Sequence, residues 1–566
     1  MTLTFKEYPY TRPDVQEYSR RFKEVLARFE SAANVQEAEA ANREYNELYG
    51  NLATQVTLVT IRYSVDTTDA FYQAEKAFMD ENIPFMLEFE NAYLRLLVDS
   101  PLRSELEAKW GRQLFELADC NLRSFSPAII EELQLENKLT TEYSRLIASA
   151  KIPFEGEERT LSQLLPFELS TDRDMRRRAS EARYGFMAEH EADFDRIYDE
   201  LVKVRTAMAK KLGYPSFVEM GYDRMKRTDY DAGMVANFRK QVQEEIVPAA
   251  TRLRERQQQR IGVDTLRYYD NGFAFKSGNA APKGDPDWIV KNGETMYREM
   301  SPETDEFFRF LLDRDLLDLL SRKGKESGGY CTYLPDYGAP FIFSNFNGTS
   351  ADIDVLTHEA GHAFQAYSSR HVEHNAYLFP TSESAEIHSM SMEFFAWPWM
   401  EKFFEEDTDK YKFDHLASAL QFIPYGVSVD EFQHFVYANP DATPQERKSA
   451  WREIEKKYLP HLNYEGSDYL ERGGFWHKQG HIFNTPFYYI DYTLAQICAF
   501  QFWKRSREDR EAAWLDYVHL CGLGGSLSFT GLVREAGLIS PFEDGCVSSV
   551  MKQIEAWLDS VDDQAL

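Results

Sequence analysis

Two imidazoles and a carboxylate stand together at residues 358–362, where the chain reads H-E-A-G-H. On a helix, residues four apart share a face, so His358 and His362 can reach one metal ion while Glu359 lies beside it. A zinc ion bound in this way activates a water molecule, and the neighbouring carboxylate can take the proton. The motif also arises by chance, in which case both histidines are hydrogen-bonded core residues and the carboxylate is solvated.

A helix is predicted around this motif. Thr349, Ser350 and Asp352 follow a turn-forming Asn-Phe-Asn-Gly stretch, and each can accept the free N–H groups of a first helical turn. Apolar residues then recur at steps of three and four, which places the two histidines on a partly apolar helix that can be buried in a cleft. These apolar residues are Ile353, Leu356, Ala360, Ala363, Phe364 and Tyr367.

The motif helix is one ligand short, because a catalytic zinc site holds three protein ligands and leaves one position for water. A second helix is predicted between a start signal at residues 380–383 and Pro398. Glu386 and Glu393 are seven residues apart and share a face of it, whereas Glu383 falls in the exposed first turn. We expect Glu386 to be the third ligand and Glu393 to support the site. A solvated helix position is the alternative for either carboxylate.

Other histidines compete for the role of third ligand. His371, His374 and His388 all follow the motif, and a third histidine ligand would define a different class of zinc enzyme. In metzincins the third histidine comes six residues after the second, and Ser368 occupies that position here. The metzincin class is therefore excluded.

A second unusual stretch, residues 473–492, holds several glycines, two histidines and three tyrosines. Its glycines predict a loop, and a helix is predicted from residue 487 onward. On such a helix Tyr488, Tyr489 and Tyr492 cannot all point one way. A tyrosine hydroxyl or the N–H of His481 can hydrogen-bond the oxyanion of a tetrahedral intermediate. The alternative is an aromatic helix that packs into a core.

From residue 344 to residue 393 the sequence resembles the thimet oligopeptidase and oligoendopeptidase F group of zinc peptidases. In that group H-E-x-G-H is followed by a helix that carries a third-ligand glutamate. The oligoendopeptidase F branch is the more similar, because Ile-His-Ser follows the expected ligand where the animal branch has Ala-Pro-Ser. The resemblance implies one zinc ion per chain, with His358, His362 and Glu386 as its ligands and Glu359 as the catalytic carboxylate.

The resemblance extends to residues 473–492, since the family has a histidine in a flexible Gly-rich loop, followed by tyrosines that contact the substrate. His481 matches that histidine and Tyr492 matches the later tyrosine, which implies a catalytic role for both. These two residues, with Tyr488 and Tyr489, are the expected substrate-binding residues. Asn-Thr-Pro stands at 484–486 where the animal enzymes have Gly-Gly-Tyr, so the counterpart of their first tyrosine stays open.

The chain is predicted to be mainly α-helical. Helices are predicted at residues 15–33, 37–63, 70–97 and 172–212, and the basic run Arg176–Arg178 is assigned to a solvated helix face. Strands or hairpins are predicted at residues 152–157, at residues 268–275 around an Asn-Gly turn, and at residues 330–346 just before the motif helix.

The resemblance implies a bilobal molecule with a deep substrate channel between its lobes. We assign residues 1–200 to a helical N-terminal lobe. Residues 201–566 are assigned to a zincin-type catalytic lobe that carries the small β-sheet.

The composition and net charge of the chain argue against two classes of binding partner. The chain of 566 residues has a formal net charge of −29, which repels nucleic acid and anionic membrane surfaces, so neither is an expected partner. Five scattered cysteines without a C-x-x-C pair, and an N-terminal stretch without an apolar core, predict a cytoplasmic protein with reduced thiols. The sequence leaves the oligomeric state, monomer or homo-oligomer, open.

These observations favour a zinc metalloendopeptidase, an oligopeptidase that hydrolyses internal bonds of short oligopeptides. Two alternatives remain. A zinc metallocarboxypeptidase of mainly helical build also uses H-E-x-x-H with a later glutamate. A peptide-binding protein that has lost catalysis is the other, and the intact Glu359 speaks against it.

Overall fold

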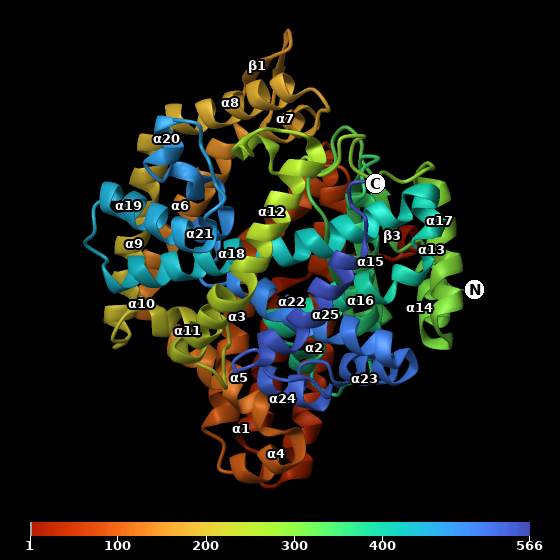
Figure 1. Cartoon of the computed structure of the whole chain (residues 1–566). Helices are drawn as coiled ribbons and strands as arrows, with labels where there is room; N and C mark the ends of the chain where they lie inside the picture. Colours follow the sequence, from red (N-terminus) through yellow and green to blue (C-terminus); the bar gives the residue numbers. More distant parts are fainter. Residues whose placement is uncertain (1–2) are drawn as a thin grey trace. The chain divides into compact units, whose positions relative to one another are not determined.

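The computed structural model describes residues 3–566, with side chains described everywhere except at residues 83–87. Helices dominate, and the strands form one two-stranded and one three-stranded sheet within this range (Figure 1). Contacts divide the chain into two compact units, each built from three separate segments. The first unit comprises residues 1–122, 281–406 and 498–538, and the second comprises residues 123–280, 407–497 and 539–566.

The helices and strands of the first unit are α1 (Val15–Glu30), α2 (Val35–Val65), α3 (Ala70–Val98), α4 (Arg103–Trp110), α5 (Arg112–Ser124), α13 (Pro286–Met300), α14 (Pro302–Asp313), β3 (Leu317–Leu320), β4 (Tyr330–Leu334), β5 (Ala339–Phe346), α15 (Ala351–Ser368), α16 (Ser382–Phe395), α17 (Glu401–Phe404), α23 (Arg510–Leu523) and α24 (Phe529–Glu535). Helix α22 (Tyr489–Glu508) begins in the second unit and ends in the first.

The second unit contains α6 (Ile130–Ala148), β1 (Ile152–Phe154), β2 (Glu157–Arg159), α7 (Leu161–Glu168), α8 (Arg173–Glu189), α9 (Glu191–Lys211), α10 (Phe217–Arg224), α11 (Ala232–Gln241), α12 (Val247–Ile261), α18 (Thr408–Ala438), α19 (Pro444–Tyr458), α20 (Asp468–Glu471), α21 (Gly480–Asn484) and α25 (Cys546–Ser560). The predicted boundary at residue 200 lies inside α9, and the division into two functional lobes stays a prediction.

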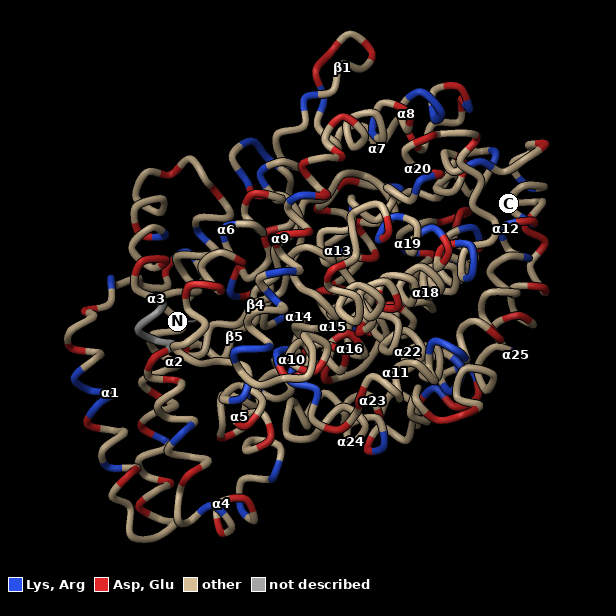
Figure 2. The backbone as a smooth tube through the Cα atoms, turned by 90° about the vertical axis from the view of Figure 1, so that its left-hand side faces the viewer, with Lys and Arg blue, Asp and Glu red and all other residues tan. Residues whose placement is uncertain are grey.

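The N-terminal helices α1, α2 and α3 pack on one another through an aromatic core. Tyr45 stacks on Tyr93 with ring centroids 3.9 Å apart, and Phe22 stacks on Phe89 at 5.1 Å. Their outer faces carry charges of both signs, as Figure 2 shows along α1, where Arg20 pairs with residues one turn away on either side. An apolar stripe on one face and ion pairs on the other explain why these segments form helices.

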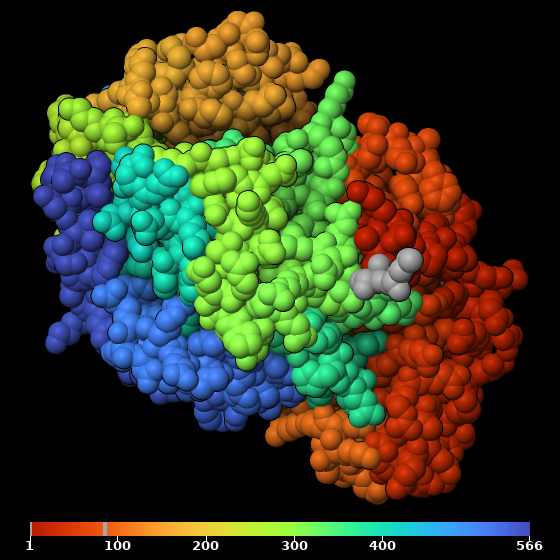
Figure 3. Space-filling view, turned by 90° about the vertical axis from the view of Figure 1, so that its right-hand side faces the viewer, coloured from red at the N-terminus to blue at the C-terminus, as the bar shows by residue number. Residues whose placement is uncertain are grey.

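The N-terminal helices lie beside the three-stranded sheet within the first unit. Phe5 packs on Phe341 of β5 at 4.6 Å, and Tyr8 stacks on Tyr337 at 3.7 Å. In Figure 3 the red segment of the chain accordingly borders the green one. The N-terminal segment is thereby joined to the sheet that precedes the motif helix.

The sheet has the order β3-β5-β4, with β5 parallel to β3 and antiparallel to β4. Central strand β5 is buried along nearly its whole length, as expected for a strand covered on both faces. Helix α15 packs against β4 and β5, so the sheet supports the helix that carries the motif. The sheet predicted at residues 330–346 is confirmed.

One local prediction in the second unit is wrong, and another, the solvated face at Arg176–Arg178, holds for Arg177 and Arg178 but not for Arg176. No strand forms at residues 268–275; a 3₁₀ turn at Tyr268–Asp270 takes its place. The fully buried Asp270 accepts hydrogen bonds from Arg173 and from Arg176, whose side chain is only 2% exposed and not solvated. A buried carboxylate requires such partners, so this ion-pair cluster prevails over the local Asn-Gly turn signal.

The other local predictions agree with the structure. The predicted N-terminal helices correspond to α1, α2 and α3, and residues 172–212 form two helices, α8 and α9. The hairpin predicted at residues 152–157 forms between β1 and β2, and its turn places Glu155 and Gly156 at positive φ. Within the described range, no helix combines the length and the apolar character needed to span a bilayer.

Candidate active site

Helix α15 begins directly after the central strand of the sheet. The Asp352 carboxylate accepts hydrogen bonds from the backbone N–H groups of Asn347 and Gly348 at 2.9 and 2.8 Å. Gly348 has a φ of 86°, a conformation that favours glycine. Asp352 thus secures the strand-to-helix turn, whereas the side chain of the N-cap residue Ser350 makes no capping hydrogen bond.

The motif helix and the second helix cross at a glycine. A Cβ added to Gly361 would lie 2.6 Å from both the carbonyl oxygen of His388 and the Cα of Ser389 on α16. Such a distance is far below van der Waals contact, so only glycine lets the two backbones approach this closely. This approach brings the carboxylate of Glu386 to the two motif histidines.

Two imidazoles and one carboxylate converge at the crossing. The Nε2 atoms of His358 and His362 lie 3.3 and 3.5 Å from Oε2 of Glu386. One ligand atom from each residue lies within 4.8 Å of the other two, which is close enough for all three to bind one ion. We call His358, His362 and Glu386 the donor triad. Two nitrogens and one carboxylate form a ligand set used by catalytic zinc sites, so the chemistry of the triad fits zinc.

Neighbouring side chains orient the donor triad. Nδ1 of His358 lies 2.7 Å from Oε1 of Glu393. This contact leaves Nε2 of His358 directed at Glu386. Ser389 donates a hydrogen bond of 3.0 Å to Oε2 of Glu386. Burial lowers the pKa of His358, but the carboxylates of Glu386 and Glu393 outweigh it and raise the pKa well above 6.5. Burial raises the pKa of Glu386, but the two imidazoles outweigh it and hold the pKa well below 4.5.

Glu359 lies beside the triad, close to the residue that precedes strand β4. A Cβ added to Gly329, just before that strand, would lie 3.8 Å from Oε1 of Glu359. Burial raises the pKa of Glu359 above 4.5, against the opposing effect of the two nearby histidines. A carboxylate with a raised pKa is a stronger base, which suits a group that accepts and returns a proton.

None of the three competing histidines, His371, His374 and His388, belongs to the donor triad. Nδ1 of His374 lies 3.3 Å from Nδ2 of Asn42, and the His374 ring meets the Trp110 ring edge to face at 4.8 Å. His388 is fully buried, Tyr517 donates a hydrogen bond to its backbone carbonyl oxygen, and neither ring nitrogen has a hydrogen-bond partner in the described part of the chain. Among the residues that the structure describes, the donor triad is the one group of three or more potential ligands that could hold a metal ion.

One expectation for the second helix is wrong. Glu383 is only 1% exposed, although its place in the first turn of α16 predicted exposure. The whole of α16 lies inside the first unit, so helical position alone did not decide the burial of this carboxylate.

The second set of predicted residues gathers in the second unit. The His481 ring lies 5.6, 5.0 and 5.8 Å from the rings of Tyr488, Tyr489 and Tyr492, and Gln479 lies 2.8 Å from its Nδ1. We call His481 and the three tyrosines the histidine–tyrosine cluster. All three tyrosines face one histidine, contrary to the expectation, because α22 begins at Tyr489 and Tyr488 precedes it.

The turn before α22 places the tyrosines. Phe487 has a φ of 68°, and its N–H donates a hydrogen bond of 2.8 Å to Oε1 of Gln433. A Cβ added to Gly221 would lie 2.6 Å from the Phe487 ring, so that glycine leaves room for it. Burial raises the pKa of Tyr489 above 10, which keeps its hydroxyl protonated at neutral pH.

Two residues that support the histidine–tyrosine cluster, Gln479 and Tyr425, were not predicted from the sequence. Gln479 bridges His481 and Tyr425, whose hydroxyl donates to Oε1 of Gln479 at 2.8 Å. Tyr425 lies more than fifty residues before His481, so no sequence pattern joins them. The adjacency of Gln479 to the predicted loop histidine was the one available signal.

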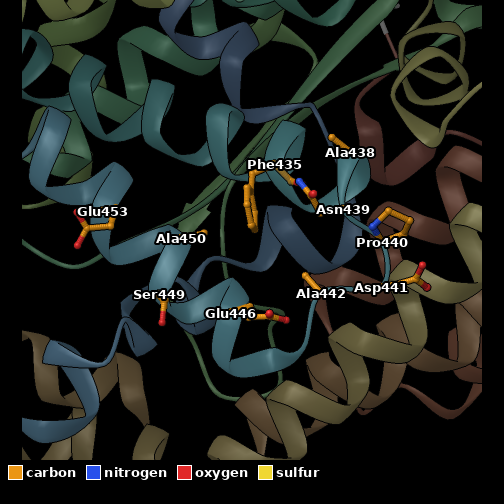
Figure 4. Close-up of a pocket in the computed structure, with 10 residues that line it drawn as sticks. All are labelled: Phe435, Ala438, Asn439, Pro440, Asp441, Ala442, Glu446, Ser449, Ala450 and Glu453. Atoms are coloured by element: carbon orange, nitrogen blue, oxygen red, sulfur yellow. The ribbon is translucent and has the colours of Figure 1, made fainter.

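A separate pocket of about 720 Å³ lies between the end of α18 and helix α19 (Figure 4). Its polar lining includes Asp441, Glu446 and Glu453. Glu446 caps the start of α19 and Glu453 pairs with Lys456, so both carboxylates have structural partners. None of the predicted site residues lines this pocket.

The helical fold and the donor triad fit a metallopeptidase. The model of the Peptidase M3 N-terminal domain matches residues 5–125, and the model of Peptidase family M3 matches residues 167–279 and 304–551. The chain therefore belongs to peptidase family M3. This confirms the predicted family resemblance and the mainly α-helical fold.

Solved structures agree with this assignment. The chain is 62% identical to PZ peptidase A, solved with an inhibitor, with a TM-score of 0.94 over 99% of this chain and 100% of that one. A putative oligoendopeptidase F from Bacillus anthracis is 58% identical, with a TM-score of 0.90 and full coverage of both chains.

A curated relative, the oligoendopeptidase F homolog of Borreliella burgdorferi, is 27% identical over 228 residues. The match covers 38% of this chain and 37% of that protein, so the chain spans just over a third of that relative's length.

Proposed function

We propose that this member of peptidase family M3 is a zinc-dependent endopeptidase that hydrolyses internal bonds of short oligopeptides. The observation that carries the proposal is the convergence of His358, His362 and Glu386 beside the half-buried carboxylate of Glu359. A zinc ion held by the triad would supply Lewis-acid chemistry and lower the pKa of a bound water toward neutrality. We expect one ion per chain.

Glu359 is the proposed proton carrier of the reaction. Its raised pKa makes its carboxylate a stronger base than an exposed glutamate, so it can accept the proton of the attacking water. The same carboxyl group then gives the proton to the nitrogen of the leaving amine. Glu393 keeps the His358 ring in one orientation throughout, because Nδ1 is engaged with its carboxylate.

The histidine–tyrosine cluster is the proposed source of hydrogen-bond donors to the substrate. We assign His481 and Tyr492 to the developing oxyanion, and Tyr488 and Tyr489 to contacts with the bound peptide. The proposal is supported by the shared packing of the four rings and by the protonated hydroxyl of Tyr489. A preorganised neutral donor stabilises negative charge as it develops.

Glu359→Gln tests the proposal. The amide cannot accept the proton, so kcat should fall by at least about 100-fold while the protein still binds zinc. Peptide hydrolysis and zinc content are measured together, with Glu373→Gln as a control, because Glu373 is about half exposed and lies outside the triad. Wild-type activity in Glu359→Gln would refute the assignment.

A second assay separates the endopeptidase from the carboxypeptidase alternative. A peptide blocked at its C-terminus offers no terminal carboxylate, so a carboxypeptidase leaves it intact and an endopeptidase cuts it. We expect internal cleavage of the blocked peptide. A peptide-binding protein without catalysis would leave every peptide intact.

We further propose that the protein works in the cytoplasm on oligopeptides, without nucleic acid or membrane partners. The five free cysteines and the net charge of −29 support this proposal. Whether it forms a homo-oligomer is left to a measurement of mass in solution.

A further inference from the structure

Lys478 lies at the end of a loop in the second unit, and buried hydrogen bonds hold the backbone of this loop in place. The preceding residue, His477, is fully buried, with Nδ1 2.9 Å from the hydroxyl of Tyr469 and Nε2 3.2 Å from a carboxylate oxygen of Asp195. Tyr143 donates a hydrogen bond of 3.0 Å to the carbonyl oxygen of His477. These contacts fix the backbone from which the Lys478 side chain leaves.

The glycines before Lys478 serve close packing. A Cβ at Gly473 would lie 2.0 Å from the carbonyl oxygen of Lys448, and one at Gly474 would lie 2.4 Å from the Tyr469 ring. The glycines predicted a loop, and the family resemblance implied that this loop is flexible. The described contacts instead show that both glycines let the loop approach its neighbours closely.

The Lys478 ammonium lies over aromatic rings. Nζ is 3.7 Å from the centroid of Phe475 and 5.9 Å from that of Tyr425. The Phe475 ring is itself flanked by Tyr184, Tyr425 and Tyr464, each with its centroid 6.0 Å away. Cation–π contact holds an ammonium in place and still leaves its N–H groups available.

No anionic partner neutralises Lys478 among the residues that the structure describes. No hydrogen bond or ion pair is found for its ammonium, although the side chain is exposed. The nearby carboxylates are engaged: Glu168 binds Arg183 through two hydrogen bonds of 2.7 Å, and Glu455 accepts from Tyr464 and Arg452. Surrounding protein, and then Arg183, lower the pKa of Lys478 to about 8, so it is still mostly charged at neutral pH.

A chain of contacts joins Lys478 to the histidine–tyrosine cluster. Tyr425, whose ring faces the ammonium, also donates a hydrogen bond to Gln479, which contacts His481. The Tyr425 ring meets the Tyr489 ring edge to face at 5.7 Å. The ammonium of Lys478 is therefore connected, through packed and hydrogen-bonded side chains, to the residues proposed to bind the peptide.

We propose that Lys478 is a specificity-determining residue whose ammonium binds a carboxylate of the peptide substrate. This inference rests on the proposed peptidase function. The carboxylate is either the free C-terminus or an Asp or Glu side chain, because both present the same anionic oxygens to an ammonium. Lys478 thereby favours peptides with a carboxylate on one side of the cleaved bond.

Two pairs of peptides distinguish the sources. The first pair differs only in a C-terminal carboxylate or amide, and the second, amidated in both members, differs only in Glu or Gln. In the wild-type protein we expect kcat/KM to favour the carboxylate member of one pair by about tenfold, the size of a hydrogen bond to a charged group. A preference in the first pair identifies the C-terminus, and one in the second identifies a side chain.

Lys478→Met keeps most of the length of the side chain and removes the charge. The carboxylate preference should fall to about one, chiefly through a higher KM, and Lys478→Arg should retain most of it. Lys456→Met is the matched control, because Lys456 lies on the exposed face of α19 in an ion pair. The cleaved bond is located by mass spectrometry in every case.

Two results would overturn the inference. One is a wild-type ratio of one in both pairs, which needs no variant. The other is a ratio that persists in Lys478→Met. Binding of the same peptides to the Glu359→Gln protein, measured by calorimetry, gives the ratio without hydrolysis. A failure of the proposed catalysis is thus distinguishable from a failure of the carboxylate contact.

Discussion

At the scale of single residues, the Glu393 carboxylate is the most informative partner of the donor triad. It contacts Nδ1 of His358 at 2.7 Å and so leaves Nε2 for the metal. In Glu393→Gln a neutral amide replaces the carboxylate, and the imidazole becomes a poorer ligand. We expect the affinity for zinc to fall about 10- to 100-fold, measured by competition with a chelator. Unchanged affinity would show that Glu393 does not support the site.

Tyr492 is the second residue with a specific expected effect. If its hydroxyl stabilises the oxyanion, Tyr492→Phe should lower kcat by about 100-fold or more and leave KM nearly unchanged. Tyr488→Phe and Tyr489→Phe should raise KM instead, since both are assigned to substrate binding. Steady-state kinetics of the three variants on one peptide decide the matter. Equal effects in all three would remove the distinct role of Tyr492.

The residues of the donor triad could be proposed as metal ligands because their spacing in the sequence is short. His358 and His362 lie one helical turn apart, and Glu386 lies on the next helix, so periodicity and a helix-start signal made Glu386 a candidate, and the family resemblance then implied the ligand set. Ser389 was not predicted, because serine on a helix has no distinctive pattern. Tyr425 was not predicted either, since only the tertiary fold brings it to Gln479.

At the scale of elements, the close crossing of α15 and α16 positions the triad, and Gly361 makes that crossing possible. Gly361→Ala adds a Cβ that would lie 2.6 Å from the α16 backbone, so the helices must separate. We expect a lower thermal midpoint, consistent with an overpacking cost of about 1–3 kcal/mol, and weaker zinc binding.

Gly185→Ala is the matched control for this prediction. Gly185 lies within α8, and no atom lies within 4 Å of the position that its Cβ would take. Alanine is the better helix former, so this variant should keep or slightly raise the thermal midpoint. If both variants melted alike and bound zinc alike, the crossing would not depend on Gly361.

Whole elements were predicted well where amphipathic periodicity was long, as in α1, α2 and α3. The segment at residues 268–275 was predicted wrongly because its conformation depends on Asp270, which is buried against Arg173 and Arg176. Those partners lie more than ninety residues earlier in the chain. Local turn chemistry carries no information about such an ion pair.

At the scale of the whole molecule, the protonation of His374 makes the free energy of unfolding depend on pH. It packs on Trp110 and Asn42, and burial lowers its pKa from 6.5 to about 4. The pKa of His374 is lower in the folded than in the unfolded protein. Its contribution to the free energy of unfolding is therefore present above pH 6.5 and is lost as the pH falls through 4. The difference between the two pKa values corresponds to about 3 kcal/mol of unfolding free energy.

His374→Gln removes this titration. Urea unfolding between pH 7 and pH 4, compared for the two proteins, should show a shallower loss of stability in the variant. His461, whose pKa burial lowers to about 3, still titrates in both proteins, so the difference isolates His374. Parallel curves for the two proteins would contradict the prediction.

We expect the donor triad to make this chain a metal-dependent endopeptidase. The most direct measurement is the mass spectrum of products from doubly blocked peptides of graded length, incubated with protein that is metal-loaded, stripped by a chelator, or reloaded with zinc. We predict internal cleavage of the short peptides by loaded and reloaded protein, and none by stripped protein. Intact peptides with loaded protein, or equal cleavage by stripped protein, would contradict this prediction.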